Sequence, residues 1–395
     1  MSGNASSEKL PGFFSTYIDF LRVVAAATVL IGHYPITVGL NNIMSGTNYK
    51  YDAVVVFFIL SGYVISYSES QLEKTWFNYV TNRMARVLPV SIASVLVALV
   101  IMLVVQPSRP ELYNHSQQLE NIPFVLFMTI SFFNEVWWNN ITPFGNGPYW
   151  SLAFEVWCYV IYGLLIFSKG WKRVSLLFIA LMLTGPKQML FLPLWLMGAA
   201  AYHLRNKFFP SVVLRRFMVV VPVLIYFLIQ LNLHRDWSYP YFGQPIESLI
   251  DHGLDGAANI GWGYLLGALM SIHIFAIRQS KSCKILENGF LERLIKTLAK
   301  YTFSLYVFHY PLMWFFLYVF NTSLSEYNVG YNIVIYILIF LAVYTLSSVF
   351  EQPKRLYRRY ISLFISSLYR GGFLSDCVSF FQRLPCTRLI HSDLD

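Results

Sequence analysis

Ten segments of this chain are apolar over lengths close to the thickness of a lipid bilayer, and no soluble domain lies between them. A helix needs about 20 mainly apolar residues to cross the hydrocarbon core. Backbone polar groups find no water there, so each segment must satisfy them internally as a helix. A further apolar run, 122–133, is too short to span and is expected to be re-entrant or interfacial. We therefore predict an all-α polytopic membrane protein with about ten transmembrane helices, at residues 17–39, 53–68, 87–106, 149–168, 173–185, 189–203, 215–232, 256–277, 299–320 and 330–350.

The positions of Lys and Arg predict the orientation of these spans. Cytoplasmic loops of membrane proteins are enriched in both residues. If the N-terminus is cytoplasmic, the predicted cytoplasmic segments hold all but five of the 29 Lys and Arg residues. The exceptions are Arg22, within the first span, and Lys50, Arg109, Lys187 and Arg235 in the outer loops. We therefore predict an even number of spans with both termini cytoplasmic.

The composition supports a membrane protein and excludes other classes. Of the 395 residues, 56% are hydrophobic and only 12% are charged, which is outside the range of soluble domains. The formal net charge of +9 follows from the topology, so we predict no binding of nucleic acid. The four cysteines form no CxxC motif and have no histidine at metal-ligand spacing. We therefore expect neither a disulfide framework nor a metal site.

The first span carries three ionisable residues, Asp19, Arg22 and His33. Such groups are costly at membrane depth unless they pair with one another or have a function. In a single helix, Arg22 and His33 would lie about 20° apart around the axis and about 16 Å apart along it. We expect both side chains to line one cavity, near opposite ends of the helix. The alternative is that Arg22 reaches the lipid headgroups and His33 marks the far interface.

The second and third spans supply further candidates. Ser61 and Gly62 lie in the middle of the second span, where small residues allow helices to approach closely. They form at least a packing notch, and Ser61 is a candidate for substrate contact. Arg83 and Arg86, three residues apart, share one helical face at the cytoplasmic surface. Paired guanidinium groups suit phosphates, either of lipid headgroups or of a phosphorylated cofactor.

The fourth and ninth spans also contain polar candidates. Trp150 and Glu155 lie near the outer end of the fourth span, and a carboxylate in an apolar helix requires a cationic or hydrogen-bonding partner. His33 has a similar predicted depth, so it is one candidate partner of Glu155. His309 in the ninth span precedes Pro311, which frees a backbone carbonyl group. His309 is either a packed, hydrogen-bonded residue or part of a substrate site.

Two long outer loops, 107–148 and 232–255, are rich in aromatic and amide side chains, for example Trp137 and Trp138. Flat aromatic faces beside amides suit the binding of carbohydrates. Aromatic belts at the membrane interface have the same composition, so both interpretations stay open. The tail from Ile361 mixes Phe, Leu and Arg and could form an amphipathic helix on the inner leaflet.

Taken in this order, the segments resemble the acyltransferase 3 family, bacterial membrane enzymes that transfer acyl groups to hydroxyl groups of surface glycans and related acceptors. The resemblance covers roughly residues 15–357. Each motif alone is weak, but their joint order and spacing is strongly specific. The motifs are YIDFLR followed by His33, FFILSGYVIS, NRMARVLP, YWSLAFEVWCY, LWLMGAAAY, TFSLYVFHYPL and FEQP.

The resemblance implies acetyl-CoA or a similar acyl-CoA as the cytoplasmic donor and a glycan hydroxyl as the acceptor. Arg22 and His33 match the essential pair of the family. Further family positions are matched by Ser61, Arg83, Arg86 and Glu155.

One position departs from the family pattern. The acidic residue often placed just before the Phe-Phe pair is Val55 here, so no function is transferred to Asp52, one turn earlier. The resemblance also divides the chain into a cytoplasmic N-terminal segment (1–15), an acyltransferase 3 transmembrane domain (16–357) and a cytoplasmic basic tail (358–395).

These observations lead to a hypothesis for the reaction. His33 acts as a general base on the acceptor hydroxyl or transiently carries the acyl group, since imidazole transfers protons near neutral pH. Glu155 orients the imidazole, and Arg22 stabilises oxygens of the thioester or of the phosphates. The hypothesis assigns the phosphates of CoA to Arg83 and Arg86, and further substrate contacts to Ser61, Trp150 and His309.

We therefore expect a multi-pass protein of the bacterial inner membrane. Its expected partners are acyl-CoA, a glycan or lipid-linked sugar acceptor, and membrane lipids. The alternative is a transporter or flippase of a glycan or lipid-linked sugar, which would also place polar groups inside its helix bundle. The sequence shows no internal repeat and no paired broken spans that would favour this alternative.

Overall fold

The computed structural model describes residues 10–35, 49–110, 116–207, 209–232, 259–280, 286–287, 289–322 and 328–369. These residues form helices and irregular connections and contain no strand, which confirms the predicted all-α fold for this part of the chain. Most of the second aromatic loop, 232–255, lies outside the described residues.

Each predicted span overlaps one helix of the structure. The prediction therefore located the apolar elements, although several ends differ by a turn or more. The helices are α1 (Gly12–His33), α3 (Tyr49–Leu72), α4 (Trp76–Val105), α6 (Trp150–Phe167), α7 (Gly170–Thr184), α8 (Pro186–Leu204), α9 (Val212–Asn232), α11 (Ile260–Arg278), α13 (Thr302–Val319) and α14 (Val329–Phe350).

The number of membrane crossings is less simple than ten. Among the described helices, eight are long and apolar enough to cross a membrane singly. The other two, α7 and α8, form a pair bent by 119° at Gly185, which has a positive φ of 81° and precedes Pro186. If this pair is re-entrant, so that it enters and leaves the membrane on one side, there are eight crossings and both termini lie on the same side of the membrane. If it is one broken span, there are nine crossings and the termini lie on opposite sides.

The helix α4 begins eleven residues earlier than the predicted third span. The side chain of Thr75 accepts a hydrogen bond from the backbone N–H of Asn78 (3.3 Å) and so caps its first turn. Pro89 lies inside the helix. Arg83 and Arg86 therefore lie within α4 rather than at its start.

The packing notch predicted at Gly62 is confirmed. A Cβ atom at Gly62 would lie 2.0 Å from the carbonyl oxygen of Trp195, and one at Gly198 would lie 2.0 Å from the carbonyl oxygen of Ile59. Helices α3 and α8 therefore approach backbone to backbone, as small residues permit within membranes.

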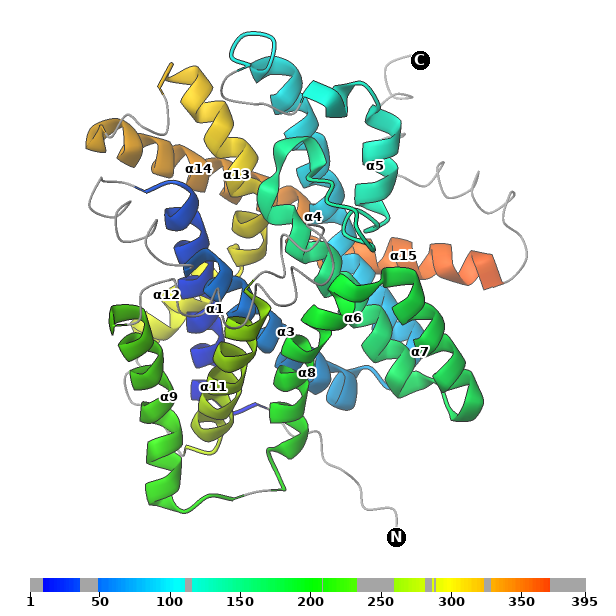
Figure 1. The fold of residues 1–395 in the computed structure, drawn as a ribbon, viewed down its shortest axis with the longest axis vertical. Helices are drawn as coiled ribbons and strands as arrows, with labels where there is room; N and C mark the ends of the chain where they lie inside the picture. Colours follow the sequence, from blue (N-terminus) through cyan, green and yellow to red (C-terminus); the bar gives the residue numbers. More distant parts are fainter. Residues whose placement is uncertain are drawn as a thin grey trace, which may run out of the picture.

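The central helices are α1 and α3, with α9 and α11 on one side of them and α6 and α7 on the other (Figure 1). α13 packs against α1, α4 and α14. The short predicted apolar run contains the nine-residue helix α5 (Ile122–Ile130), which packs against α4.

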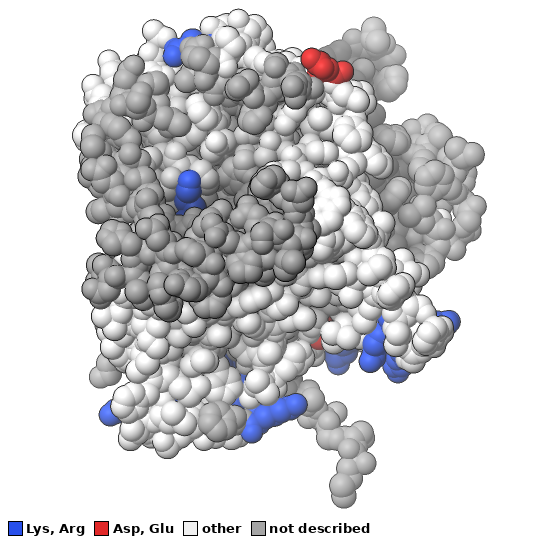
Figure 2. All heavy atoms as spheres, in the orientation of Figure 1, with Lys and Arg blue, Asp and Glu red and all other residues white. Residues whose placement is uncertain are grey.

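Two further helices are amphipathic rather than apolar. They are α12 (Gly289–Ala299), which packs on α1, and α15 (Lys354–Tyr369), which packs on α4. The predicted domain boundary at 357/358 falls inside α15. Figure 2 shows a face on which few charged side chains are visible, with most of its visible Lys and Arg side chains near the lower end.

Candidate active site

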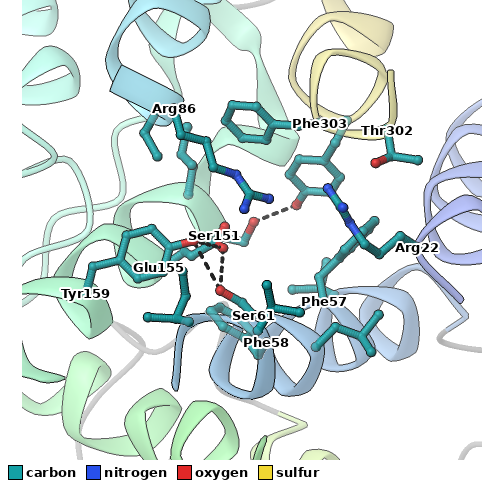
Figure 3. Close-up of a pocket in the computed structure, with 17 residues that line it drawn as sticks. Arg22, Phe57, Phe58, Ser61, Arg86, Ser151, Glu155, Tyr159, Thr302 and Phe303 are labelled. Carbon is teal, nitrogen blue, oxygen red and sulfur yellow. Dashed lines mark hydrogen bonds between the residues drawn. The ribbon is translucent and has the colours of Figure 1, made fainter. Parts of the chain in front are cut away.

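A small cavity of about 70 Å³, lined by both polar and apolar side chains, lies among helices α1, α3, α4, α6 and α13. Its charged and hydroxyl-bearing walls come from five separate helices, which only the tertiary fold brings together. Figure 3 shows the side chains of Arg22 and Arg86 directed into it from different sides. The polar lining consists of Arg22, Ser61, Arg86, Ser151, Glu155, Tyr159, Thr302 and Tyr306.

The cavity carries more positive than negative charge. Its lining holds two guanidinium groups, Arg22 and Arg86, and one carboxylate, Glu155. Asp19, one turn before Arg22, lies 3.7 Å from the Arg22 guanidinium, and both side chains are 24% exposed. Asp19 therefore offsets the excess positive charge of the lining, but the two guanidinium groups still offer donors that suit a ligand with phosphate or carbonyl oxygens.

A third cation lies near this cavity, outside the membrane-spanning helices. Burial lowers the pKa of Lys354 at the start of α15, and the positive charges of Arg86 and Arg22 lower it further. Glu351, 3.8 Å from the Lys354 amine, acts in the opposite direction. Lys354 was not among the residues predicted from the sequence.

Glu155 is held by hydroxyl groups. Ser61 Oγ donates a hydrogen bond to Glu155 Oε1 at 2.7 Å, and Tyr159 OH donates to the same oxygen. Trp195 Nε1 donates to Ser61 Oγ at 3.2 Å. These bonds, drawn in part in Figure 3, tie α3, α6 and α8 together beside the cavity.

Tyr306 forms one wall of the cavity and connects it to the histidines. Its hydroxyl group donates to the carbonyl oxygen of Pro148 at 3.0 Å and lies 2.6 Å from Ser151 Oγ. Its own carbonyl oxygen lies 2.8 Å from Nδ1 of His309, one turn later in α13. The carbonyl group that Pro311 frees, Val307 O, accepts a hydrogen bond from Asn146 Nδ2 at 2.9 Å.

His33 lies beyond this wall and next to His309. Nδ1 of His33 is 3.2 Å from Nε2 of His309, and the ring of Tyr310 packs against His33 edge to face, with ring centroids 5.1 Å apart. His33 is half-buried and His309 is buried. His33 is not among the residues that line this cavity, so the expectation that Arg22 and His33 line one cavity stays a prediction.

The structure groups the predicted site residues differently from the hypothesis. Arg22, Ser61, Arg86 and Glu155 share one cavity, a grouping that the sequence did not predict. Glu155 bonds to Ser61 and Tyr159, and the hydrogen bonds of the described residues include no contact between Glu155 and His33. The ring next to His33 belongs to His309 instead.

Two other predicted residues lie apart from the cavity lining. Arg83 Nη2 pairs with Glu73 Oε1 at 2.5 Å and donates to Ser68 Oγ at 3.1 Å. Trp150 packs its ring against Phe154 and Phe191. Whether either residue contacts a substrate stays a prediction.

Sequence reasoning missed Tyr159 and Tyr306. Both lie one turn from a predicted residue, since Tyr159 follows Glu155 by four positions and Tyr306 precedes His309 by three. That spacing places side chains on the same helical face and could have identified both.

The fold and the cavity together define a helical membrane protein with a site that holds two arginines and a glutamate between its helices. The chain belongs to the acyltransferase 3 family, whose acyltransferase domain matches residues 15–351, so the resemblance found in the sequence is confirmed.

The chain is also similar to an O-acetyl transferase of Shigella phage Sf6, with 26% identity over 201 residues. The match covers 46% of this chain and 58% of the phage protein, so it spans little more than half of that relative. No solved structure matches the chain. The family and this relative support O-acyl transfer as the reaction.

Proposed function

We propose that this protein transfers an acetyl group from cytoplasmic acetyl-CoA to a hydroxyl group of an extracytoplasmic or lipid-linked polysaccharide sugar. The observation that carries this proposal is the cavity with Arg22, Arg86 and Glu155, which lies along α1 from His33. Family membership and the name of the phage relative support the reaction class. The proposed location is the bacterial inner membrane.

The cavity supports binding of a thioester donor. Arg22 and Arg86 would hold phosphate or carbonyl oxygens of acetyl-CoA through charge-assisted hydrogen bonds. Arg86 is favoured over Arg83 as a donor contact, because Arg83 already pairs with Glu73.

The proposed transfer is a single acyl exchange. His33 removes the proton from the acceptor hydroxyl as that oxygen attacks the carbonyl carbon of the thioester. The C–O bond forms and the C–S bond breaks, and the imidazolium returns the proton to the departing thiolate. CoA then leaves as the free thiol, and the acceptor carries an ester. Tyr306 lines the cavity and its carbonyl oxygen contacts His309, so the proposed path of the thioester to His33 runs past Tyr306.

The direct test uses the surface polysaccharide of the host. A strain lacking this gene is complemented with wild type, with His33→Ala, or with His203→Ala, a histidine of α8 that contacts Tyr162. Proton NMR of the purified polysaccharide then reports acetyl signals and shifted ring protons. We expect acetylation with wild type and His203→Ala and none with His33→Ala. Equal acetylation by His33→Ala would refute the assigned base. An unchanged acetyl pattern with an altered amount of glycan would favour the transporter instead.

The proposed sidedness has its own test. Two variants, Lys50→Cys and Lys172→Cys, are made in a cysteine-free background, so that each carries a single thiol. That thiol is labelled with a membrane-impermeant reagent in intact and in opened cells. We expect Lys50→Cys to react in intact cells and Lys172→Cys only after opening. Labelling of both from the same face would refute the topology.

A further inference from the structure

The two imidazole rings of His33 and His309 are arranged so that the positions of their protons can be deduced. His309 contacts the carbonyl oxygens of Leu305 and Tyr306 through Nδ1, at 2.9 and 2.8 Å. Its Nε2 faces Nδ1 of His33 at 3.2 Å. Nδ1 of His33 also lies 2.9 Å from the carbonyl oxygen of Val29.

The tautomer of His309 follows from its two carbonyl partners. A carbonyl oxygen can only accept a hydrogen bond, so Nδ1 of His309 must carry the proton. In the neutral ring the other nitrogen then has a lone pair and is an acceptor. Nε2 of His309 therefore presents a lone pair to His33.

The tautomer of His33 follows in turn. Its Nδ1 faces two acceptors, Val29 O and His309 Nε2, so this nitrogen carries a proton and shares it between them. Val29 O is also positioned to accept the helical backbone N–H of His33, four residues later. His309 thus supplies an acceptor for His33 Nδ1 that the helix does not already use.

We propose that His309 is a positioning residue that holds His33 as the Nδ1–H tautomer and leaves Nε2 of His33 as the basic nitrogen. This inference rests on the proposed function and adds the atom that takes the proton. Among the described residues, no hydrogen bond reaches Nε2 of His33, so this nitrogen is available to an acceptor hydroxyl. Tyr310 packs against the His33 ring and restricts its rotation.

The same hydrogen bonds also stabilise the protonated His33 ring that forms during transfer. When Nε2 of His33 takes the hydroxyl proton, the ring becomes an imidazolium whose Nδ1–H still donates to His309 Nε2 and Val29 O. No proton has to move between the two rings, and no contact has to break. An orienting partner that fixes the productive tautomer of a catalytic histidine has a large effect in other enzymes, about 10⁴-fold in kcat for a serine protease.

The first test is spectroscopic and needs no acceptor. The full chain, labelled with ¹⁵N-histidine and reconstituted in phospholipid nanodiscs, contains eight histidines, and a His33→Gln sample identifies the His33 signals by difference. At a pH where His33 is neutral, we expect Nδ1 to show the shift of a protonated nitrogen and Nε2 that of an unprotonated one. The opposite tautomer in the wild-type protein would overturn the inference, whether or not the protein transfers acetyl groups.

The second test compares two substitutions of similar size. His309→Gln keeps a side-chain oxygen that can accept from His33, whereas His309→Leu keeps the bulk without an acceptor. With acetyl-CoA and the host polysaccharide as substrates, we expect His309→Leu to lower kcat about 100-fold or more with little change in the KM for acetyl-CoA. His309→Gln is expected to retain activity within about 10-fold of wild type and to keep the Nδ1–H signal of His33. Equal loss in both variants, or wild-type activity of His309→Leu, would overturn the role of His309. An inactive wild-type protein would instead overturn the proposed function.

Discussion

Replacing Gly62 by Ala tests the close approach of α3 and α8. The added Cβ atom would lie 2.0 Å from the carbonyl oxygen of Trp195, whereas ordinary contacts begin at 3.4 Å. The helices must therefore separate by about 1.4 Å at this point. Overpacking of this kind typically costs about 1–3 kcal/mol of folding free energy.

The same displacement would reach the cavity. Ser61, the residue before Gly62, donates to Glu155 at 2.7 Å and accepts from Trp195 at 3.2 Å. A shift of more than 1 Å would stretch at least one of these contacts beyond hydrogen-bonding distance. We therefore expect Gly62→Ala to reduce acetyl transfer as well as stability.

The assay is the unfolding free energy of the purified protein in detergent, with Gly289→Ala as the matched control. A Cβ atom at Gly289 meets nothing within 4 Å, so this control should be neutral or slightly stabilising. Gly198→Ala should cost about as much as Gly62→Ala, since its Cβ would lie 2.0 Å from Ile59 O. Once one substitution has separated the helices, the second should add less, so the double variant should lose less than the sum. Unchanged stability of Gly62→Ala, or additive losses, would refute the reasoning.

Three further predictions concern polar residues outside the histidine pair. Lys354 lies near Arg22 and Arg86, and we expect it to assist them in holding the phosphates of acetyl-CoA. Because its pKa is lowered, its positive charge is lost at a lower pH than for an ordinary lysine, so the KM for acetyl-CoA should rise earlier on the alkaline side. Lys354→Arg should remove this rise in a pH series of initial rates, and an identical profile would contradict the role of Lys354. Asp52 accepts hydrogen bonds from α9 and α11 through Tyr226, Gln230 and Trp262, at 2.7–2.9 Å. Asp52→Leu should cost about 2–4 kcal/mol of unfolding free energy, clearly more than Asp52→Asn, because it leaves all three donors unpaired. The side chain of Glu351 accepts hydrogen bonds from the backbone N–H and the hydroxyl group of Ser304, near the start of α13. Glu351→Ala should therefore lower the melting temperature more than Glu351→Gln. Equal melting temperatures of the two variants would exclude this capping role.

Apolar periodicity and length were sufficient to predict most of the fold. The spans follow from the cost of exposing backbone polar groups to hydrocarbon, which depends on local sequence alone. The α7–α8 pair is the exception. Its helices have 15 and 19 residues, and whether they count as two spans, one or none depends on the bend at Gly185.

The sequence by itself also identified the residues whose burial in a membrane requires an explanation, because a charge in an apolar span is costly wherever it lies. Arg22 and Glu155 were found in this way, and they share one cavity. Their partners were not predictable, since a helix determines the direction of a side chain but not the neighbouring helix that it meets.

Only the tertiary structure decided how the polar residues are paired. Arg83 and Arg86 are equivalent in sequence, yet one pairs with Glu73 and the other lines the cavity, because α4 presents them to different neighbours. Likewise, the packing of α13 against α1 brings His309 to His33, 276 positions away in the chain, while Glu155 bonds to Ser61. Contacts between residues so far apart depend on how the helices pack, which local sequence does not specify.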